Sequence, residues 1–346
     1  MNIVDFDYHL PAELIAQRPA RPRDTSQLLV LHRGSGEIEH RRFGDLLSYL
    51  EPEDVVVLND TRVISARLRG RRHPGGGRAE VLLLSELEEG VWEALVTPGR
   101  RIQPGRQLVF GDGELRAEIV GRAPAGARFI RFFSAGGASA TADVSALLAR
   151  LGELPLPPYV HTTLANESDY QTVYASAPGA SAAPTAGLHF TREMLDAVRA
   201  RVHGVTAVTL HVGVGTFRPV HTENVEDHEM HSERYLIPQS TATLVTRALE
   251  EGRRILAIGT STARALEAAA TEGKIRAGSG ETSLFIRPGY QFQTVRALLT
   301  NFHLPRSTLL LLVCAFAGRS RILRAYREAM QLEYRFLSFG DAMLIL

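Results

Sequence analysis

The stretch PEDVVVLNDTRV, residues 52–63, has four consecutive apolar residues at its centre. A short apolar run bounded by proline and asparagine is typical of a strand that is buried on both faces of a sheet. Four polar residues follow the run and would lie at the carboxyl end of this strand: Asn59, Asp60, Thr61 and Arg62. Ligands of open α/β sheets bind at that end, so the stretch predicts a covered sheet and part of a binding site.

The rest of the chain supplies further strands, and helices to cover the sheet. Strands are predicted at residues 28–31, 206–212 and 254–258, and helices at residues 43–50, 191–201, 241–251, 263–271, 309–316 and 322–334. Alternation of this kind favours an α/β fold with a parallel or mixed sheet covered by helices.

Between about residue 69 and residue 135 the amino-acid pattern differs from that of the rest of the chain. Short β-rich segments, separated by glycine turns every eight to twelve residues or so, are predicted at residues 79–84, 91–97, 107–110, 114–120 and 128–133. This spacing indicates a small β-barrel, and the stiff segment LPLPPY then returns the chain to the first domain. We therefore expect an α/β domain of residues 1–66 and 155–346, with an inserted barrel domain of residues 67–154.

The composition narrows the class of protein. The chain has 346 residues, of which 45% are hydrophobic and 22% are charged, and these are ordinary globular values. Its longest apolar run, residues 309–317, is shorter than the roughly 20 residues that a membrane helix needs. The amino-terminal residues lack the pattern of a signal peptide, and Cys314 is the only cysteine. We expect a soluble cytoplasmic protein, and a monomer because no long exposed apolar stripe is evident.

Several kinds of chemistry are disfavoured by the residues present. Lys274 is the only lysine and lies in a polar, glycine-flanked stretch, which argues against a Schiff-base mechanism. Neither a Gly-Lys-Ser/Thr phosphate loop nor a G-x-S-x-G nucleophile motif occurs. Positive charge is carried by arginine, and an arginine-rich stretch begins at residue 62. Such arginines either bind phosphates or belong to solvated loops.

Three segments have the context of a ligand site. In GTSTARALE, residues 259–267, a predicted strand runs into a helix, and the exposed amides there bind an anion or form an ordinary helix start. The second segment, TLHVGVGTF, residues 209–217, is a predicted strand followed by a Gly-x-Gly turn. It has only two of the three glycines of the dinucleotide-binding fingerprint. The third segment, LTNFHLP, residues 299–305, places polar residues between apolar runs.

Three histidines lie among large apolar residues: His189, His211 and His303. Polar groups in such surroundings are costly unless they are bonded, so each is a satisfied core residue or a member of a shared site with one general base. A fourth pattern, His228, His231 and Glu233, invites a metal interpretation, but its spacing differs from the usual zinc motif. Hydrogen bonding is the expected role of that pattern.

Eight motifs together resemble one known family. They are NDTRV (59–63), LPLPPY (154–159), DYQTVYA (169–175), AAPTAGLHF (182–190), TLHVGVGTFRPV (209–220), HEMHSE (228–233), TNFHLPRSTLLLLV (300–313) and YRFLSFGDAMLI (334–345). The chain resembles the S-adenosylmethionine:tRNA ribosyltransferase-isomerases of queuosine biosynthesis from end to end. One departure is Ser261, which stands where the family usually has threonine and keeps the hydroxyl.

The resemblance implies a transferase and isomerase of the pentosyltransferase class. S-adenosylmethionine would be a co-substrate that donates its ribosyl group, and no metal is expected. The acceptor would be the 7-aminomethyl-7-deazaguanine wobble base of a tRNA with a GUN-type anticodon. The products would be epoxyqueuosine-tRNA, adenine and methionine.

The resemblance also suggests roles for residues of this chain. We expect proton transfer by His189, His211 or His303, and anion binding by Arg264 with Thr260 and Thr262. Other expected substrate contacts are Asn59, Asp60, Thr61, Arg62, Tyr170, Gln171, Thr185, Gly187, Gly213, Thr216, Phe217 and Asn301. The expected tRNA contacts are Arg67, Arg69, Arg71 and Arg72.

Two other functions are compatible with the residues alone. One is a histidine-ligated metallohydrolase built on His211, His228, His231 and Glu233. The other is a non-catalytic RNA-binding module carried by the barrel domain.

Overall fold

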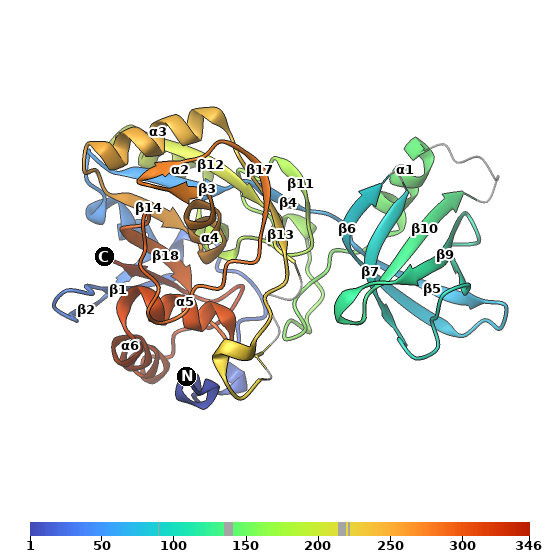
Figure 1. The fold of residues 1–346 in the computed structure, drawn as a ribbon. Helices are drawn as coiled ribbons and strands as arrows, with labels where there is room; N and C mark the ends of the chain where they lie inside the picture. Colours follow the sequence, from blue (N-terminus) through green and yellow to red (C-terminus); the bar gives the residue numbers. More distant parts are fainter. Residues whose placement is uncertain (89, 135–140, 214–218, 221) are drawn as a thin grey trace. The chain divides into compact units, whose positions relative to one another are not determined.

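The computed structural model describes all residues except 89, 135–140, 214–218 and 221. The chain forms two compact units, which are described separately (Figure 1). The α/β unit comprises Met1–Arg62, Pro157–Ala177 and Ala183–Leu346, and the barrel unit comprises Val63–Leu156 and Pro178–Ala182. The expected domain boundaries at residues 66 and 155 stay a prediction.

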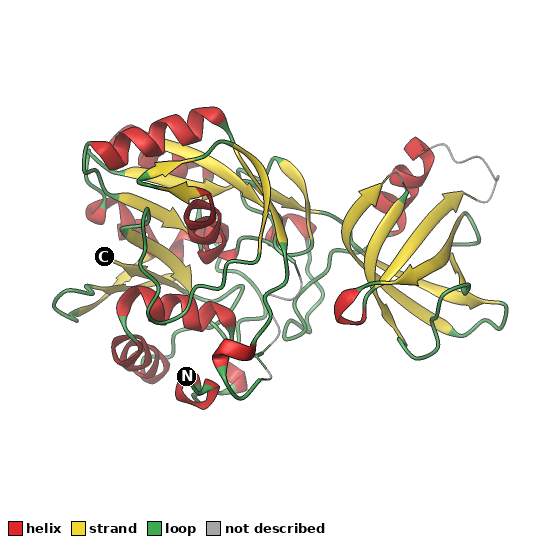
Figure 2. Ribbon diagram, viewed as in Figure 1, coloured by secondary structure: helices red, strands yellow, loops and turns green. Residues whose placement is uncertain are grey.

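The α/β unit is built on a mixed sheet of nine strands (Figures 1 and 2). In sheet order the strands are β17 (Gly278–Thr282), β13 (Glu233–Ile237), β12 (Gly204–Leu210), β3 (Val55–Asn59), β14 (Ile255–Ile258), β18 (Ala297–Asn301), β19 (Ala342–Ile345), β1 (Gln27–Leu31) and β2 (Ile38–Arg42). The four neighbours β12, β3, β14 and β18 run parallel, whereas the pairs at both edges are antiparallel. The expected α/β fold with a covered sheet is confirmed.

Strand β3 lies inside this parallel group, as its apolar run predicts. All five of its residues are buried, and it pairs with β12 on one side and β14 on the other. Because the four strands run in one direction, their carboxyl ends meet at one edge of the sheet. This edge brings together Asn59, Leu210, Ile258 and Asn301.

Helices cover both faces of the sheet (Figure 2). They are α2 (Arg192–Arg201), α3 (Gln239–Glu250), α4 (Thr260–Ala269), α5 (Thr308–Ala317) and α6 (Arg319–Gln331), with 3-10 turns η1 (Ile3–Phe6), η2 (Ala12–Leu14), η3 (Arg23–Thr25), η4 (Phe43–Tyr49), η6 (Glu167–Tyr170), η7 (Thr185–His189) and η9 (Val225–Asp227). The helix expected at residues 43–50 is thus a 3-10 helix. Two hydroxyls cap helices as their positions suggest, Thr191 at α2 and Ser307 at α5.

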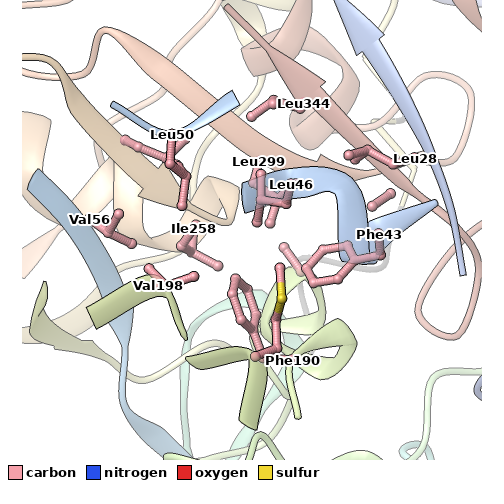
Figure 3. Packing of buried hydrophobic residues seen from close by; sticks show 14 of the residues in the cluster. Leu28, Phe43, Leu46, Leu50, Val56, Phe190, Val198, Ile258, Leu299 and Leu344 are labelled. Atoms are coloured by element: carbon pink, nitrogen blue, oxygen red, sulfur yellow. The ribbon is translucent and has the colours of Figure 1, made fainter. Parts of the chain in front are cut away.

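One hydrophobic core fills the space between the sheet and the layer formed by α2, η4 and η7 (Figure 3). Val56 and Ile258 extend from the sheet toward Val198 of α2, while Phe43 packs edge to face on Phe190. Helix α3 covers the other face, where Thr241 bonds to the hydroxyl of Thr206. Apolar side chains that alternate along the strands therefore hold both layers in place.

The barrel unit contains a closed barrel of six strands, which confirms the expected barrel (Figure 1). The strands are β5 (Arg67–His73), β6 (Arg78–Glu88), β7 (Val91–Thr97), β8 (Gln107–Phe110), β9 (Leu115–Arg122) and β10 (Arg128–Ser134), and the unit also has η5 (Pro124–Gly126) and α1 (Thr141–Leu151). The arginine-rich stretch is strand β5, in which Leu68 is buried in the barrel core and Arg69 and Arg71 are exposed. Neither β5 nor α1 was evident from the sequence, because charged residues mask the alternation of β5.

Short strands complete the description. Strands β4 (Thr61–Val63) and β11 (Ala177–Ala180) form one two-stranded sheet, and β15 (Ala270–Thr271) and β16 (Lys274–Ile275) form another. Within the described part of the chain, no helix has both the length and the apolar character needed to span a membrane.

Candidate ligand cleft

A cleft of about 490 Å³, partly open to solvent, lies at the carboxyl edge of the parallel strands. It is lined by residues from η7 and the preceding loop, from the ends of β12 and β18, and from the start of α4. The lining residues are Ala183, Pro184, Thr185, Ala186, Val212, Glu233, Gly259, Thr260, Ser261, Arg264, Thr300, Asn301, His303 and Leu309. Five residues expected at the site thus come together here: Thr185, Thr260, Arg264, Asn301 and His303.

The start of helix α4 forms one wall of the cleft. Gly259 turns the chain from β14 into the helix with a φ of 94°, a conformation that favours glycine. No side chain of the described residues caps this helix, which leaves its first backbone N–H groups to a ligand. Thr260 and Ser261 face the cleft, whereas Thr262 is buried and donates its hydroxyl to the Ile258 carbonyl at 2.6 Å. Thr262 therefore supports the turn.

Arg264 joins the cleft to a buried ion pair. Its Nη1 binds the Glu233 carboxylate, its Nε donates to the Leu284 carbonyl at 3.2 Å, and both charged side chains are 6% exposed. The other Glu233 oxygen accepts from the Gly213 amide at 3.0 Å. Nη2 of Arg264 is buried and has no hydrogen-bond partner among the described residues. A guanidinium held in this way leaves one edge for an anionic ligand.

His303 lines the cleft, and hydrogen bonds hold its ring, its backbone amide and its carbonyl. Its Nε2 lies 2.8 Å from the Thr300 hydroxyl, its amide donates to the Tyr326 hydroxyl at 3.1 Å, and its carbonyl accepts from Tyr8. Burial lowers the pKa of His303 to about 3, so the imidazole is neutral at neutral pH. It can therefore exchange hydrogen bonds with a ligand without carrying charge.

His189 is not among the residues that line the cleft. Its Nδ1 lies 2.8 Å from the Ser26 hydroxyl, and its ring stacks on Phe43 with 5.0 Å between the centroids. Burial lowers the pKa of His189 to about 4. Its Nε2 and the Asn301 Oδ1 are both buried without a hydrogen-bond partner within the described residues. His189 is thus a neutral core side chain, and a catalytic role for it stays a prediction.

The NDTRV motif forms a second polar group beside the cleft. Asn59 is fully bonded: its amide donates to the Leu210 carbonyl and to Ser261, and its carbonyl oxygen accepts from two backbone amides. Thr61 bonds to Nδ1 of His211 at 2.8 Å. Burial lowers the pKa of His211, although the negative charge of Asp60 opposes this shift. Asn59 therefore fixes the strand ends, while Asp60 and His211 lie next to each other.

The remaining expected contacts are dispersed. Tyr170 is fully buried against Phe339, Gln171 is half-buried, and Arg62 is exposed. Gly187 is buried in η7, and Gly213 donates its amide to Glu233. Thr216 and Phe217 lie outside the described residues. Substrate binding by these residues stays a prediction.

The expected tRNA contacts lie on strand β5. Arg67 and Arg69 both approach Glu80, and Arg69 is also 3.3 Å from Glu153. Arg71 is exposed, and Arg72 lies against Gly77. The stretch is therefore partly neutralised by acids, with Arg71 forming no ion pair among the residues that the structure describes.

The H-x-x-H-x-E pattern takes up separate positions. His228 packs edge to face on Phe285, His231 is exposed, and Glu233 pairs with Arg264. Across the described residues, no three His, Cys, Asp or Glu side chains are placed to hold a metal ion.

Glu233, Ser261, Thr300 and Leu309 line the cleft but were not among the expected substrate contacts. Three of them belong to the quoted family motifs, and Ser261 belongs to the hydroxyl-rich turn before α4. Their side chains converge only because β13, β18 and α4 meet at one edge of the sheet, which no local pattern shows.

Fold and cleft together define an α/β protein with an inserted β-barrel and a polar cleft at the carboxyl ends of parallel strands. Comparisons with known proteins agree with this class. The family model described as "Queuosine biosynthesis protein" matches residues 3–345. The chain belongs to this family.

Relatives match along their whole length. S-adenosylmethionine:tRNA ribosyltransferase-isomerases from Moorella thermoacetica and Staphylococcus haemolyticus are 53% and 49% identical to this chain, with 100% of each chain covered. The crystal structure of S-adenosylmethionine tRNA ribosyltransferase from Thermotoga maritima is similar at 40% identity and a TM-score of 0.56, covering 99% of this chain and 100% of that one. These matches do not support the metallohydrolase or the non-catalytic RNA-binding module.

Proposed function

We propose that this chain is a ribosyltransferase-isomerase that transfers the ribosyl part of S-adenosylmethionine to a tRNA base. The acceptor is the 7-aminomethyl-7-deazaguanine wobble base of a tRNA with a GUN-type anticodon, and the products are epoxyqueuosine-tRNA, adenine and methionine. The observation that carries this proposal is family membership over residues 3–345, together with relatives of that name matched at full length.

The cleft has features that suit S-adenosylmethionine. The methionine carboxylate would bind at the uncapped start of α4 and to Nη2 of Arg264, because both supply N–H donors to an anion. Thr260 and Ser261 add hydroxyls at the same place. We place the donor substrate in this cleft, without a metal.

The reaction needs proton transfer at three points. A proton beside the sulfonium is removed, the departing adenine takes up a proton, and the acceptor amine loses one. His303 and His211 are favoured for these steps over His189, because His303 lines the cleft and His211 adjoins Asp60, whereas His189 bonds to Ser26. Single alanine variants of the three histidines test the assignment through adenine release. Wild-type rates in all three would show it to be wrong.

The tRNA would contact arginines of strand β5. Phosphates are bound by such side chains in a salt-dependent way, and single-stranded anticodon bases are bound in addition by stacking. Reversal of Arg69, Arg71 and Arg72 to glutamate should weaken tRNA binding and flatten its dependence on salt. Unchanged affinity and salt slope in a filter-binding titration would place the tRNA elsewhere.

The deciding experiment mixes the purified chain with S-adenosylmethionine and a tRNA that carries the precursor base. Adenine and methionine should appear in equal amounts, with the modified base in the tRNA digest. Release of neither product would overturn the proposed function. We further propose that the enzyme acts as a cytoplasmic monomer. Equilibrium sedimentation tests the oligomeric state, and the measured mass should be that of one chain, 38.0 kDa.

A further inference from the structure

Asp60 is a half-buried carboxylate that pairs with no cation among the residues that the structure describes. It follows the central strand β3, and its oxygens accept from two hydroxyls, Thr209 Oγ1 at 2.6 Å and Ser176 Oγ at 2.7 Å. No arginine, lysine or histidine of the described chain lies within 4.0 Å of its oxygens. A carboxylate offers about four acceptor positions, so part of its capacity is unused.

Other buried carboxylates of the α/β unit are compensated differently. Asp54 and Asp341 are each 1% exposed, and each binds an arginine. Glu267 binds no arginine but accepts from three backbone amides and the Tyr290 hydroxyl. Within the described part of the chain, Asp60 binds neither an arginine nor a set of backbone amides. A partly desolvated negative charge of this kind favours a cation that arrives from outside.

The surroundings of Asp60 are arranged for a ligand. The Tyr174 hydroxyl is buried and finds no hydrogen-bond partner in the described chain, and burial and the charge of Asp60 raise the pKa of Tyr174. A buried hydroxyl without a partner destabilises the folded protein, and a bound ligand that bonds to it would relieve this cost. On the other side, Ser176 is exposed, so the carboxylate can be reached from solvent.

Asp60 also adjoins the proposed S-adenosylmethionine cleft. Its neighbour Asn59 donates to Ser261, which lines the cleft, at 3.0 Å. His211, which interacts with Asp60, precedes the cleft residue Val212. A group bound at Asp60 would therefore lie beside the donor substrate.

From this arrangement we infer that Asp60 binds the cationic aminomethyl group of the acceptor base. The inference rests on the proposed function. An alkyl amine of this kind has a pKa near that of lysine, about 10, and is an ammonium ion at neutral pH. Its N–H groups suit the unused carboxylate positions, whereas the sulfonium of the donor has no N–H. The donor methionine also carries an ammonium group, but this group is attached to the same carbon as the carboxylate. It would therefore lie with the carboxylate at the end of the cleft formed by α4 and Arg264. Asp60 is thus the residue that distinguishes an amine from a neutral acceptor.

The test compares two tRNAs that differ only at the target base. One carries the aminomethyl group, and the other carries a neutral hydroxymethyl group of similar size. Wild-type protein without S-adenosylmethionine should bind the aminomethyl tRNA about tenfold more tightly or better, as expected for a partly buried charge pair. Asp60→Asn keeps the shape but removes the charge, so the ratio of the two dissociation constants should fall toward one. The matched control Asp196→Asn, at an exposed position on α2, should keep the wild-type ratio.

Each outcome decides for or against the inference. Equal binding of both tRNAs by wild-type protein, or an unchanged ratio in Asp60→Asn, would overturn it. A raised KM for S-adenosylmethionine with an unchanged ratio would assign Asp60 to the donor instead. Because Asp60→Asn could unfold, Asp60→Glu provides a second variant, which keeps the negative charge and should keep the ratio above that of a neutral side chain. The proposed function is judged separately, since its failure is the absence of adenine release by wild-type protein.

Discussion

Arg264 links the core of the α/β unit to the cleft. Its ion pair with Glu233 and its bond to the Leu284 carbonyl use two sides of the guanidinium, and Nη2 is left toward the cleft lining. A planar fork of donors can serve three partners at once, which a lysine ammonium cannot do in the same geometry. Glu233 is therefore as important as Arg264 for the shape of the site.

Arg264→Lys should raise the KM for S-adenosylmethionine by about tenfold or more, with a smaller effect on kcat, because an ammonium cannot keep the contacts to Glu233 and the Leu284 carbonyl and also supply the Nη2 donor to the ligand. Initial rates of adenine release at varied donor concentration measure the effect. Arg247→Lys, in an exposed pair on α3, is the matched control. An unchanged KM would remove Arg264 from the donor site.

The buried histidines make the stability of the fold depend on pH. The folded pKa values of His189 and His303, about 4 and about 3, lie below the ordinary 6.5. Between these limits the unfolded chain binds protons that the folded chain does not, so stability is full above pH 6.5 and is lost as the pH falls.

Lowering the pH from 7 to 5 should therefore reduce the free energy of unfolding by about 2 kcal/mol for each of the two histidines, because the unfolded chain takes up the proton. Urea unfolding at the two pH values measures the loss, and His189→Gln should make the loss smaller. An equal loss in wild type and variant would show that His189 is not held neutral.

At the scale of elements, η7 is tightly packed where it forms the wall of the cleft. A Cβ atom on Gly187 would lie 2.0 Å from the Tyr174 hydroxyl and 2.8 Å from Cγ2 of Thr172. This explains why the AAPTAGLHF motif has a glycine inside a buried 3-10 turn.

Gly187→Ala should lower the free energy of unfolding by about 1–3 kcal/mol, because a methyl group is forced into a filled space. Gly34→Ala is the control, since nothing lies within 4 Å of the Cβ position there. Thermal and urea unfolding compare the two, and Tyr174→Phe should partly restore Gly187→Ala. Equal stability of both alanine variants would contradict this packing.

At the scale of the whole molecule, the insert closes on itself. Arg67 and Glu153 form an antiparallel bridge with N···O distances of 3.0 and 2.7 Å, which brings the two ends of the barrel segment together. The barrel core, from Ala66 to Leu148, is formed by residues of this segment alone. We propose that the segment folds without the α/β unit.

A fragment of residues 63–156 should accordingly show a cooperative thermal transition and dispersed amide resonances, because it keeps a closed barrel and its own hydrophobic core. Calorimetry and proton–nitrogen spectra of the purified fragment are the measurements. A fragment that lacks a transition would show that the barrel depends on the rest of the chain.

The helices of the α/β unit, the buried centre of its sheet and most strands of the barrel could be predicted from the sequence. The apolar run of β3, the hydroxyl caps of α2 and α5, and the glycine-punctuated strands of the barrel are local signals, because burial and turn chemistry leave their pattern in neighbouring residues. Strand β5 was missed because arginines occupy its exposed positions.

The sequence by itself indicated strands β1, β3, β12 and β14, five of the barrel strands and helices α2 to α6, and its motifs indicated the family, whereas no local signal indicated β13, β17, β18 and β19. Only the tertiary structure decided which polar residues share the cleft. His189 and His303 have similar surroundings in the sequence, yet His303 lines the cleft and His189 stacks on Phe43. The physical reason is that a side chain's partners depend on the order of strands in the sheet, which joins residues far apart in the chain.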